Sequence, residues 1–131
     1  MTRKVAKKPE TILSDAIREA LSLEPGLLIW RNSNGVFRAR GFVVHAGLPK
    51  GSADLVGVLG VDVLFPMAIG EEERTIGLFV ALEVKRPGEK ADPHQLEWLE
   101  SVRRAGGFAC VVTSAEEARA AIKRAREGSV E

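Results

Sequence analysis

The stretch that most constrains the fold is residues 78–85, Leu-Phe-Val-Ala-Leu-Glu-Val-Lys, an apolar run that ends in two charged residues. Its composition predicts a central, largely buried strand. Because side chains alternate along a strand, Glu83 and Lys85 would point to the same face, about 7 Å apart. Leu78, Val80, Leu82 and Val84 would line the opposite face. Unpaired charges are costly in such an environment, so this pair requires an explanation.

Length and composition narrow the class of protein. A chain of 131 residues is long enough for one domain with a real core. The single cysteine, Cys110, cannot form an internal disulfide and lies in an apolar run, which favours a reducing compartment. The sequence has no stretch long enough to span a membrane and no signal-peptide core, so we expect a cytoplasmic protein with no membrane partner.

The pattern of apolar residues, prolines and glycines predicts a mixed α/β fold. Residues 1–9 form a basic, flexible arm, and residues 10–131 form one domain. The elements expected in that domain are a helix to Leu21, strands at 27–30, 55–65 and 75–86, a helix from Pro93, a strand at 108–112 and a helix after Ser114. Residues 36–44 continue as extended chain, Gly57 and Gly60 mark bends, and 70–74 form a hairpin tip. This order, αβββαβα, predicts an antiparallel meander followed by a helical crossover to a further strand.

Asp54 is the second carboxylate of interest. It begins the apolar run 55–58, so it would lie near Glu83 if the two strands are hairpin neighbours. Two nearby carboxylates attract a hard cation such as Mg²⁺ or Mn²⁺, which promotes phosphodiester cleavage, while a lysine faces the nucleophile or phosphate. The alternative is that Asp54 is a turn residue and Glu83 pairs only with Lys85.

Two further polar residues have competing interpretations. Glu10 lies at the edge of the apolar face of the first helix, where it could lean toward the sheet or simply complement the helix dipole. Gln95 follows Asp92 by three residues, so it could close a capping box or reach the centre beside Lys85.

The basic residues are clustered although the net charge is only +1. Arg3, Lys4, Lys7 and Lys8 precede the first helix. From Trp30 to Ala53 the chain contains no Asp or Glu but carries Arg31, Arg38, Arg40 and Lys50. A local basic surface is compatible with nucleic-acid binding.

Several short motifs occur in an order that resembles the VRR-NUC family of the PD-(D/E)XK nuclease superfamily. They are Trp30-Arg31-Asn32-Ser33-Asn34-Gly35, Gly47-Leu48-Pro49-Lys50-Gly51-Ser52-Ala53-Asp54-Leu55-Val56-Gly57, Glu83-Val84-Lys85, Gln95 and Gly106-Gly107. The resemblance extends from about Glu10 to the last helix. One departure is Ala53, which stands where the superfamily name has proline.

The resemblance implies a restriction-endonuclease-like core and a Mg²⁺- or Mn²⁺-dependent deoxyribonuclease. It implies that Asp54, Glu83, the Val84 carbonyl and Glu10 bind the metal and that Lys85 and Gln95 act at the catalytic centre. Arg31, Asn32, Lys50, Ser52, Arg38 and Arg40 would contact nucleic acid. Small stand-alone members look like phage or prophage enzymes that act on branched DNA, such as four-way junctions or flaps, and a homodimer would present two active sites.

Two other interpretations stay open. The chain could be a nucleic-acid-binding or assembly module that keeps the fold without chemistry, although Asp54, Glu83 and Lys85 are all present. It could also be an unrelated α/β protein in which Glu-x-Lys occurs by chance.

Overall fold

Residues 78–84 of the apolar run lie in the longest strand of the sheet, and Lys85 follows its last residue. A computed structural model describes residues 6–33 and 35–131. The elements, in chain order, are α1 (Pro9–Leu21), β1 (Leu27–Arg31), β2 (Gly35–Ala39), β3 (Phe42–Ala46), β4 (Leu55–Pro66), β5 (Glu71–Val84), α2 (Pro93–Arg104), β6 (Phe108–Val112) and α3 (Ala115–Arg126). Four strands form a sheet in the order β1-β4-β5-β6.

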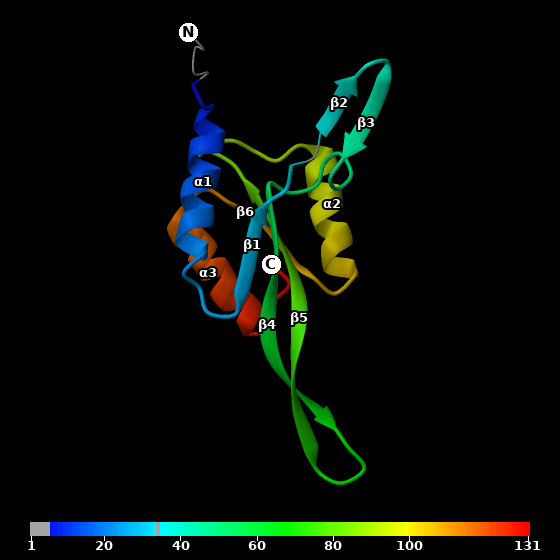
Figure 1. The fold of residues 1–131 in the computed structure, drawn as a ribbon. Coiled ribbons are helices and arrows are strands. Elements are labelled where there is room, and N and C mark those ends of the chain that lie inside the picture. Colours follow the sequence, from blue (N-terminus) through cyan, green and yellow to red (C-terminus); the bar gives the residue numbers. More distant parts are fainter. Residues whose placement is uncertain (1–5, 34) are drawn as a thin grey trace.

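The sheet is mixed, as predicted. β1, β4 and β5 pair antiparallel, whereas β6 pairs parallel to β5 after the crossover through α2. Helices α1 and α3 lie on one face of the sheet and α2 lies on the other (Figure 1). The mixed α/β prediction is therefore confirmed, and the four-stranded sheet with its three helices follows the predicted order αβββαβα.

The predicted alternation along β5 is also confirmed. Val80, Leu82 and Val84 are buried in the main core together with residues of α1 and α3. Ala81 belongs to a second, smaller core with Leu99 of α2. A fully buried aliphatic side chain contributes about 1.5–3 kcal/mol, so β5 is stabilised from both faces. The charged end of this strand is consequently held in a rigid setting.

The segment predicted as extended chain at 36–44 is instead a separate hairpin. Strands β2 and β3 form their own two-stranded sheet, with Ala39 paired to Phe42. The turn residues Arg40 and Gly41 have φ values of 40° and 81°. Positive φ at both central residues is typical of the tight turn whose twist matches a hairpin, and this turn was missed in the sequence.

The β4–β5 hairpin differs from expectation in two details. Its turn lies at 67–70, where Met67 N–H donates to the Gly70 carbonyl at 3.0 Å, so the tip expected at 70–74 is wrong and Glu71 already pairs with Pro66. Gly57 and Gly60 were expected as bends or bulges, and the continuous register of β4 shows that neither forms a bulge. Position 57 requires glycine because of the close approach of β1: a Cβ there would lie 2.1 Å from the Leu28 carbonyl oxygen.

The structure describes only part of the predicted N-terminal arm at residues 1–9. Residues 1–5, which include Arg3 and Lys4, lie outside the described residues, as does Asn34. Helix α1 begins at Pro9, one residue before the predicted domain boundary. In the described residues, no helix combines the length and the apolar content needed to cross a bilayer.

Candidate active site

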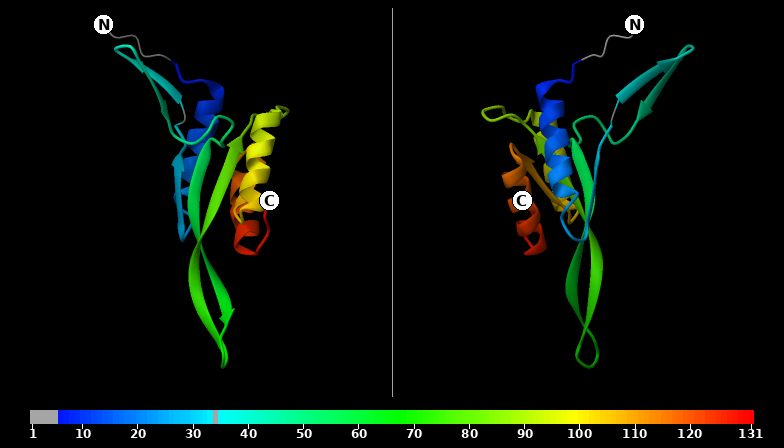
Figure 2. Two further views of the ribbon diagram at one scale, coloured as in Figure 1. Left: turned by 90° about the vertical axis from the view of Figure 1, so that its right-hand side faces the viewer. Right: turned by 60° about the vertical axis from the view of Figure 1, so that its left-hand side comes forward.

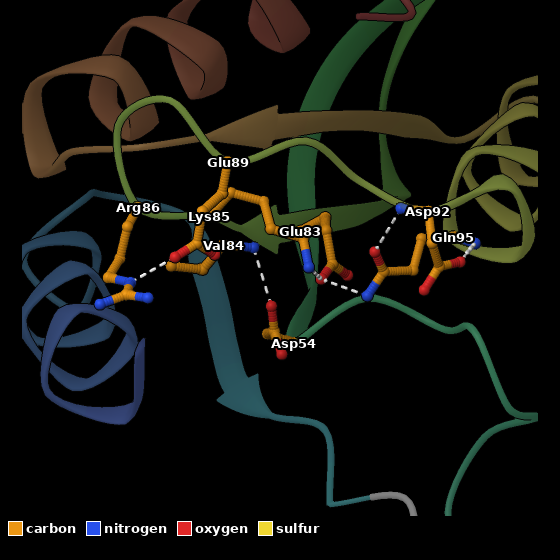
Figure 3. Close-up of polar contacts among 8 residues, drawn as sticks. All are labelled: Asp54, Glu83, Val84, Lys85, Arg86, Glu89, Asp92 and Gln95. Atoms are coloured by element: carbon orange, nitrogen blue, oxygen red, sulfur yellow. Dashed lines mark hydrogen bonds and ion pairs between the residues drawn. The ribbon is translucent and has the colours of Figure 1, made fainter. Parts of the chain in front are cut away.

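Strand register brings Asp54 and Glu83 to the same edge of the sheet. Leu55, the first residue of β4, pairs with Leu82 of β5, so the residues just beyond this pair are neighbours. The Val84 N–H donates a 2.8 Å hydrogen bond to Oδ2 of Asp54 (Figure 3). Asp54 therefore touches the strand that carries Glu83, in the arrangement that hairpin pairing was expected to produce.

Glu83 is a buried carboxylate with one satisfied oxygen. The residue is 2% exposed. Its Oε1 accepts a 3.0 Å hydrogen bond from Nε2 of Gln95 and lies 3.7 Å from Nζ of Lys85. Its Oε2 has no hydrogen-bond donor among the described residues. An ionised oxygen in that position is costly unless a proton or a cation meets it.

The pKa of Glu83 also indicates that a negative charge on this carboxyl group is unfavourable without a proton or a cation. The pKa of Glu83 is raised to about 8, chiefly by burial and next by the charge of the nearby Asp54 carboxylate. A hydrogen bond to Asp54 also raises this pKa, because a protonated Glu83 can donate to the other carboxylate. Lys85 lowers the pKa but does not offset these effects. Below about pH 8, Glu83 is consequently mostly protonated in the metal-free protein.

Lys85 follows the last residue of β5 and remains close to the sheet. Its N–H donates to the Val112 carbonyl of β6 at 3.0 Å. Its side chain is 14% exposed and reaches back to Glu83, on the face that alternation predicted. The ammonium group is thus held beside the carboxylate pair while keeping access to a ligand.

Gln95 fulfils both of the roles that its sequence position suggested. Asp92 caps α2 by accepting from the Gln95 N–H at 2.9 Å, and Oε1 of Gln95 accepts from the Asp92 N–H at 2.9 Å. The amide nitrogen of the same side chain donates to Glu83 (Figure 3). Only the nitrogen can donate to a carboxylate, so this network determines the orientation of the amide. The first turn of α2 therefore holds Glu83 in place.

Glu10 lies near this centre but has a different immediate partner. Its pKa is raised, chiefly by a hydrogen bond between its carboxyl group and that of Glu89, with smaller effects of burial and of the charges of Glu89 and Asp54. Glu89 in turn pairs with Arg86 (Figure 3). Glu89 was not predicted from the sequence, where its only signal is that it is the one acid between Glu83 and Asp92.

The expected metal ligands are therefore only partly assembled. Asp54 and Glu83 face each other, whereas Val84 meets Asp54 through its N–H and Glu10 contacts Glu89. Across residues 6–33 and 35–131, no group of three or more His, Cys, Asp or Glu side chains is placed to hold one metal ion. Mg²⁺ commonly binds to one or two protein carboxylates and completes its shell with water and substrate phosphate. The unsatisfied Oε2 of Glu83 beside Asp54 fits that mode of binding.

Two of the residues expected to contact nucleic acid, Asn32 and Ser52, support the segment around Asp54. The side chain of Asn32 donates to Oγ of Ser52 at 2.7 Å and to the Ala53 carbonyl at 3.0 Å. The Asn32 N–H donates to the Asp54 carbonyl at 2.8 Å. Ser52 is buried. These contacts hold the segment that leads into β4 and so position the Asp54 carboxylate.

The four basic residues expected to bind nucleic acid are all exposed. Arg31 ends β1, Lys50 lies in the loop before β4, and Arg38 and Arg40 belong to the β2–β3 hairpin. They lie along the segments that enter and leave the Asp54 edge of the sheet.

Comparison with known proteins adds no assignment. No protein-family model matches the chain. No curated protein matches it.

Proposed function

We propose that this protein is a divalent-metal-dependent nuclease that hydrolyses DNA phosphodiester bonds, as a member of the VRR-NUC family. The observation that carries the proposal is the buried Glu83: its carboxyl group lies beside that of Asp54, its Oε1 meets Gln95 and Lys85, and its Oε2 has no hydrogen-bond donor among the described residues. A structural ion pair between Glu83 and Lys85 alone would not account for the second carboxylate. A site for a cation and a phosphate accounts for all four groups.

The four side chains have distinct tasks in this proposal. Asp54 and Glu83 hold Mg²⁺ or Mn²⁺, which would polarise the phosphate and lower the pKa of water. Lys85 orients the attacking water and offsets the negative charge that develops on the phosphate. Gln95 keeps Glu83 in its binding rotamer through the 3.0 Å hydrogen bond. The Val84 N–H does the same for Asp54.

Substrate binding relies on charge rather than on base recognition. Arg31, Lys50, Arg38 and Arg40 would contact backbone phosphates on either side of the cleaved bond, which provides affinity without sequence preference. From the resemblance we further propose that the preferred substrate is branched DNA, a four-way junction or a flap. A homodimer would allow two sites to act on one branched molecule.

The test compares cutting of labelled four-way junction, flap, linear duplex and single-stranded DNA in Mg²⁺, Mn²⁺ or EDTA. We expect metal-dependent cutting that falls by about 100-fold or more in Glu83→Gln and Lys85→Ala. Asp62→Asn is the matched control, because Asp62 is an exposed acid on β4, the strand that follows Asp54, and accepts a hydrogen bond from Thr75. No cutting of any substrate, with equal DNA binding by all variants, would favour the non-catalytic binding module.

A further inference from the structure

The β2–β3 hairpin projects from the molecule at the end where α1 begins, away from the tip of the β4–β5 hairpin (Figure 2). Its strands pair with each other and not with the main sheet. Phe42, Val43 and Val44 are 72%, 57% and 50% exposed. An isolated two-stranded hairpin is only marginally stable in water. Consecutive exposed apolar residues on such an element indicate a surface that acquires a partner.

The hairpin also carries a strong local charge. Arg38 pairs across the hairpin with Val43, and Arg40 lies at the tip, next to Phe42 at the start of the return strand. No acidic residue occurs between Trp30 and Ala53 to offset these charges. A second copy of the same basic hairpin would be repelled, whereas a polyanion would be attracted. Charge complementarity therefore favours nucleic acid as the occupant.

Both ends of the hairpin are attached at the candidate active site. Arg31, the last residue of β1, pairs with Leu55, the first residue of β4, and the Asn32 N–H donates to the Asp54 carbonyl. A five-residue strand spans about 16 Å. Successive phosphates of one DNA strand rise by about 3.4 Å along the helix axis, so a hairpin of this length can lie along roughly five nucleotides.

This inference rests on the proposed nuclease function. We propose that the β2–β3 hairpin, called the arm below, binds DNA that contains unpaired bases next to the cleaved phosphate. Arg38 and Arg40 contact backbone phosphates, and Phe42 stacks on a base that is not held in a duplex. Stacking on an aromatic ring tolerates any base sequence and requires an exposed base face. The arm therefore selects branched or single-stranded regions over continuous duplex.

The stacking contact is tested by binding in EDTA, where metal-dependent cutting does not interfere. The probes are a flap DNA with 2-aminopurine at the branch point and the matching linear duplex. We expect the wild type to prefer the flap and to change the 2-aminopurine fluorescence. Phe42→Ala should reduce the ratio of the two affinities by about tenfold. Phe42→Trp should retain the preference, and Leu64→Ala, an exposed apolar residue on the other hairpin, should behave as wild type.

The phosphate contacts are tested by the salt dependence of the same binding. Each of Arg38→Gln and Arg40→Gly should lower the slope of log affinity against log salt by about one. Glycine suits position 40, because Arg40 already has a positive φ. Arg119→Gln on the exposed surface of α3 is the charge control and should leave the slope unchanged.

Different outcomes overturn different proposals. If the wild type cuts DNA while Phe42→Ala keeps the flap preference and the fluorescence change, the proposed role of the hairpin is wrong. The proposed nuclease function is then retained. A wild type that binds the flap through Phe42 but cuts nothing in Mg²⁺ or Mn²⁺ overturns the nuclease and retains the arm. If Phe42→Ala converts a dimer to a monomer in sedimentation without a change in flap preference, the hairpin is an interface between copies.

Discussion

The Val84 N–H donates to Oδ2 of Asp54 at 2.8 Å, which ties the first carboxylate of the site to the strand that carries the second. The bond joins two residues that are 30 positions apart in the chain. A backbone donor cannot change rotamer, so Asp54 is held toward Glu83 in spite of the repulsion between two carboxylates. A bound cation or a proton would relieve this repulsion between the Asp54 and Glu83 carboxylates.

The metal-free protein should lose stability as pH rises from about 4.5 toward 8. The pKa of Glu83 is 4.5 in the unfolded chain and is raised to about 8 in the folded protein. Between these two pH values the unfolded chain has lost the proton that the folded protein still binds, so a rise in pH favours unfolding. The slope should reach at most about 1.4 kcal/mol per pH unit. Urea unfolding in EDTA at pH 5, 7 and 9 measures it.

Glu83→Gln should remove most of this pH dependence and be more stable than the wild type at pH 9, because the amide never ionises. Glu72→Gln, which breaks only an exposed ion pair with Arg74, should keep the wild-type slope and is the matched control. If Glu83→Gln and the wild type show parallel pH profiles, the buried carboxylate does not titrate in this range.

Mg²⁺ or Mn²⁺ should raise the melting temperature of the wild type, and more at pH 8 than at pH 6. The metal competes with the proton for the Asp54–Glu83 pair, so removing the proton strengthens metal binding. Thermal melts with and without EDTA provide the measurement. Asp54→Asn and Glu83→Gln should not respond, and an equal response in these variants would place the metal elsewhere.

Gln95→Ala and Asp92→Ala should separate helix capping from support of Glu83. Each loses one of the two hydrogen bonds of the α2 capping box: Gln95→Ala loses the bond from the Asp92 N–H, and Asp92→Ala loses the bond from the Gln95 N–H. Each should be destabilised by about 0.5–2 kcal/mol. Only Gln95→Ala also removes the hydrogen bond to Glu83. We therefore expect nuclease activity to fall markedly in Gln95→Ala and to change little in Asp92→Ala at a temperature where both are folded. Equal nuclease activities in the two variants would show that Gln95 only caps α2 and does not support Glu83.

Asn32→Ala should lower the cleavage rate without weakening DNA binding. The Asn32 side chain donates hydrogen bonds to Ser52 and Ala53, next to Asp54. Its removal should therefore make the position of the Asp54 carboxylate less well defined without removing a contact to DNA phosphate. Arg31→Gln, at the neighbouring exposed position, should instead weaken binding in a salt-dependent manner. Single-turnover cleavage and anisotropy titrations distinguish the two effects, and a weaker affinity in Asn32→Ala would restore its expected DNA contact.

The sequence by itself determined the local features of this fold. The alternation at 78–85 located the core strand and the shared face of Glu83 and Lys85, because side-chain direction in a strand follows from a period of two. The capping box of Asp92 and Gln95 was equally readable, since it depends on four consecutive residues.

Only the tertiary structure decided how these pieces meet. The pairing of Leu55 with Leu82 brings Asp54 to Glu83, and that register depends on a turn and on contacts across the whole hairpin. The contact of Glu10 with Glu89 and the support of Asp54 by Asn32 likewise join segments far apart in sequence. Local periodicity carries no information on such distances, which are set by packing of the sheet against its helices.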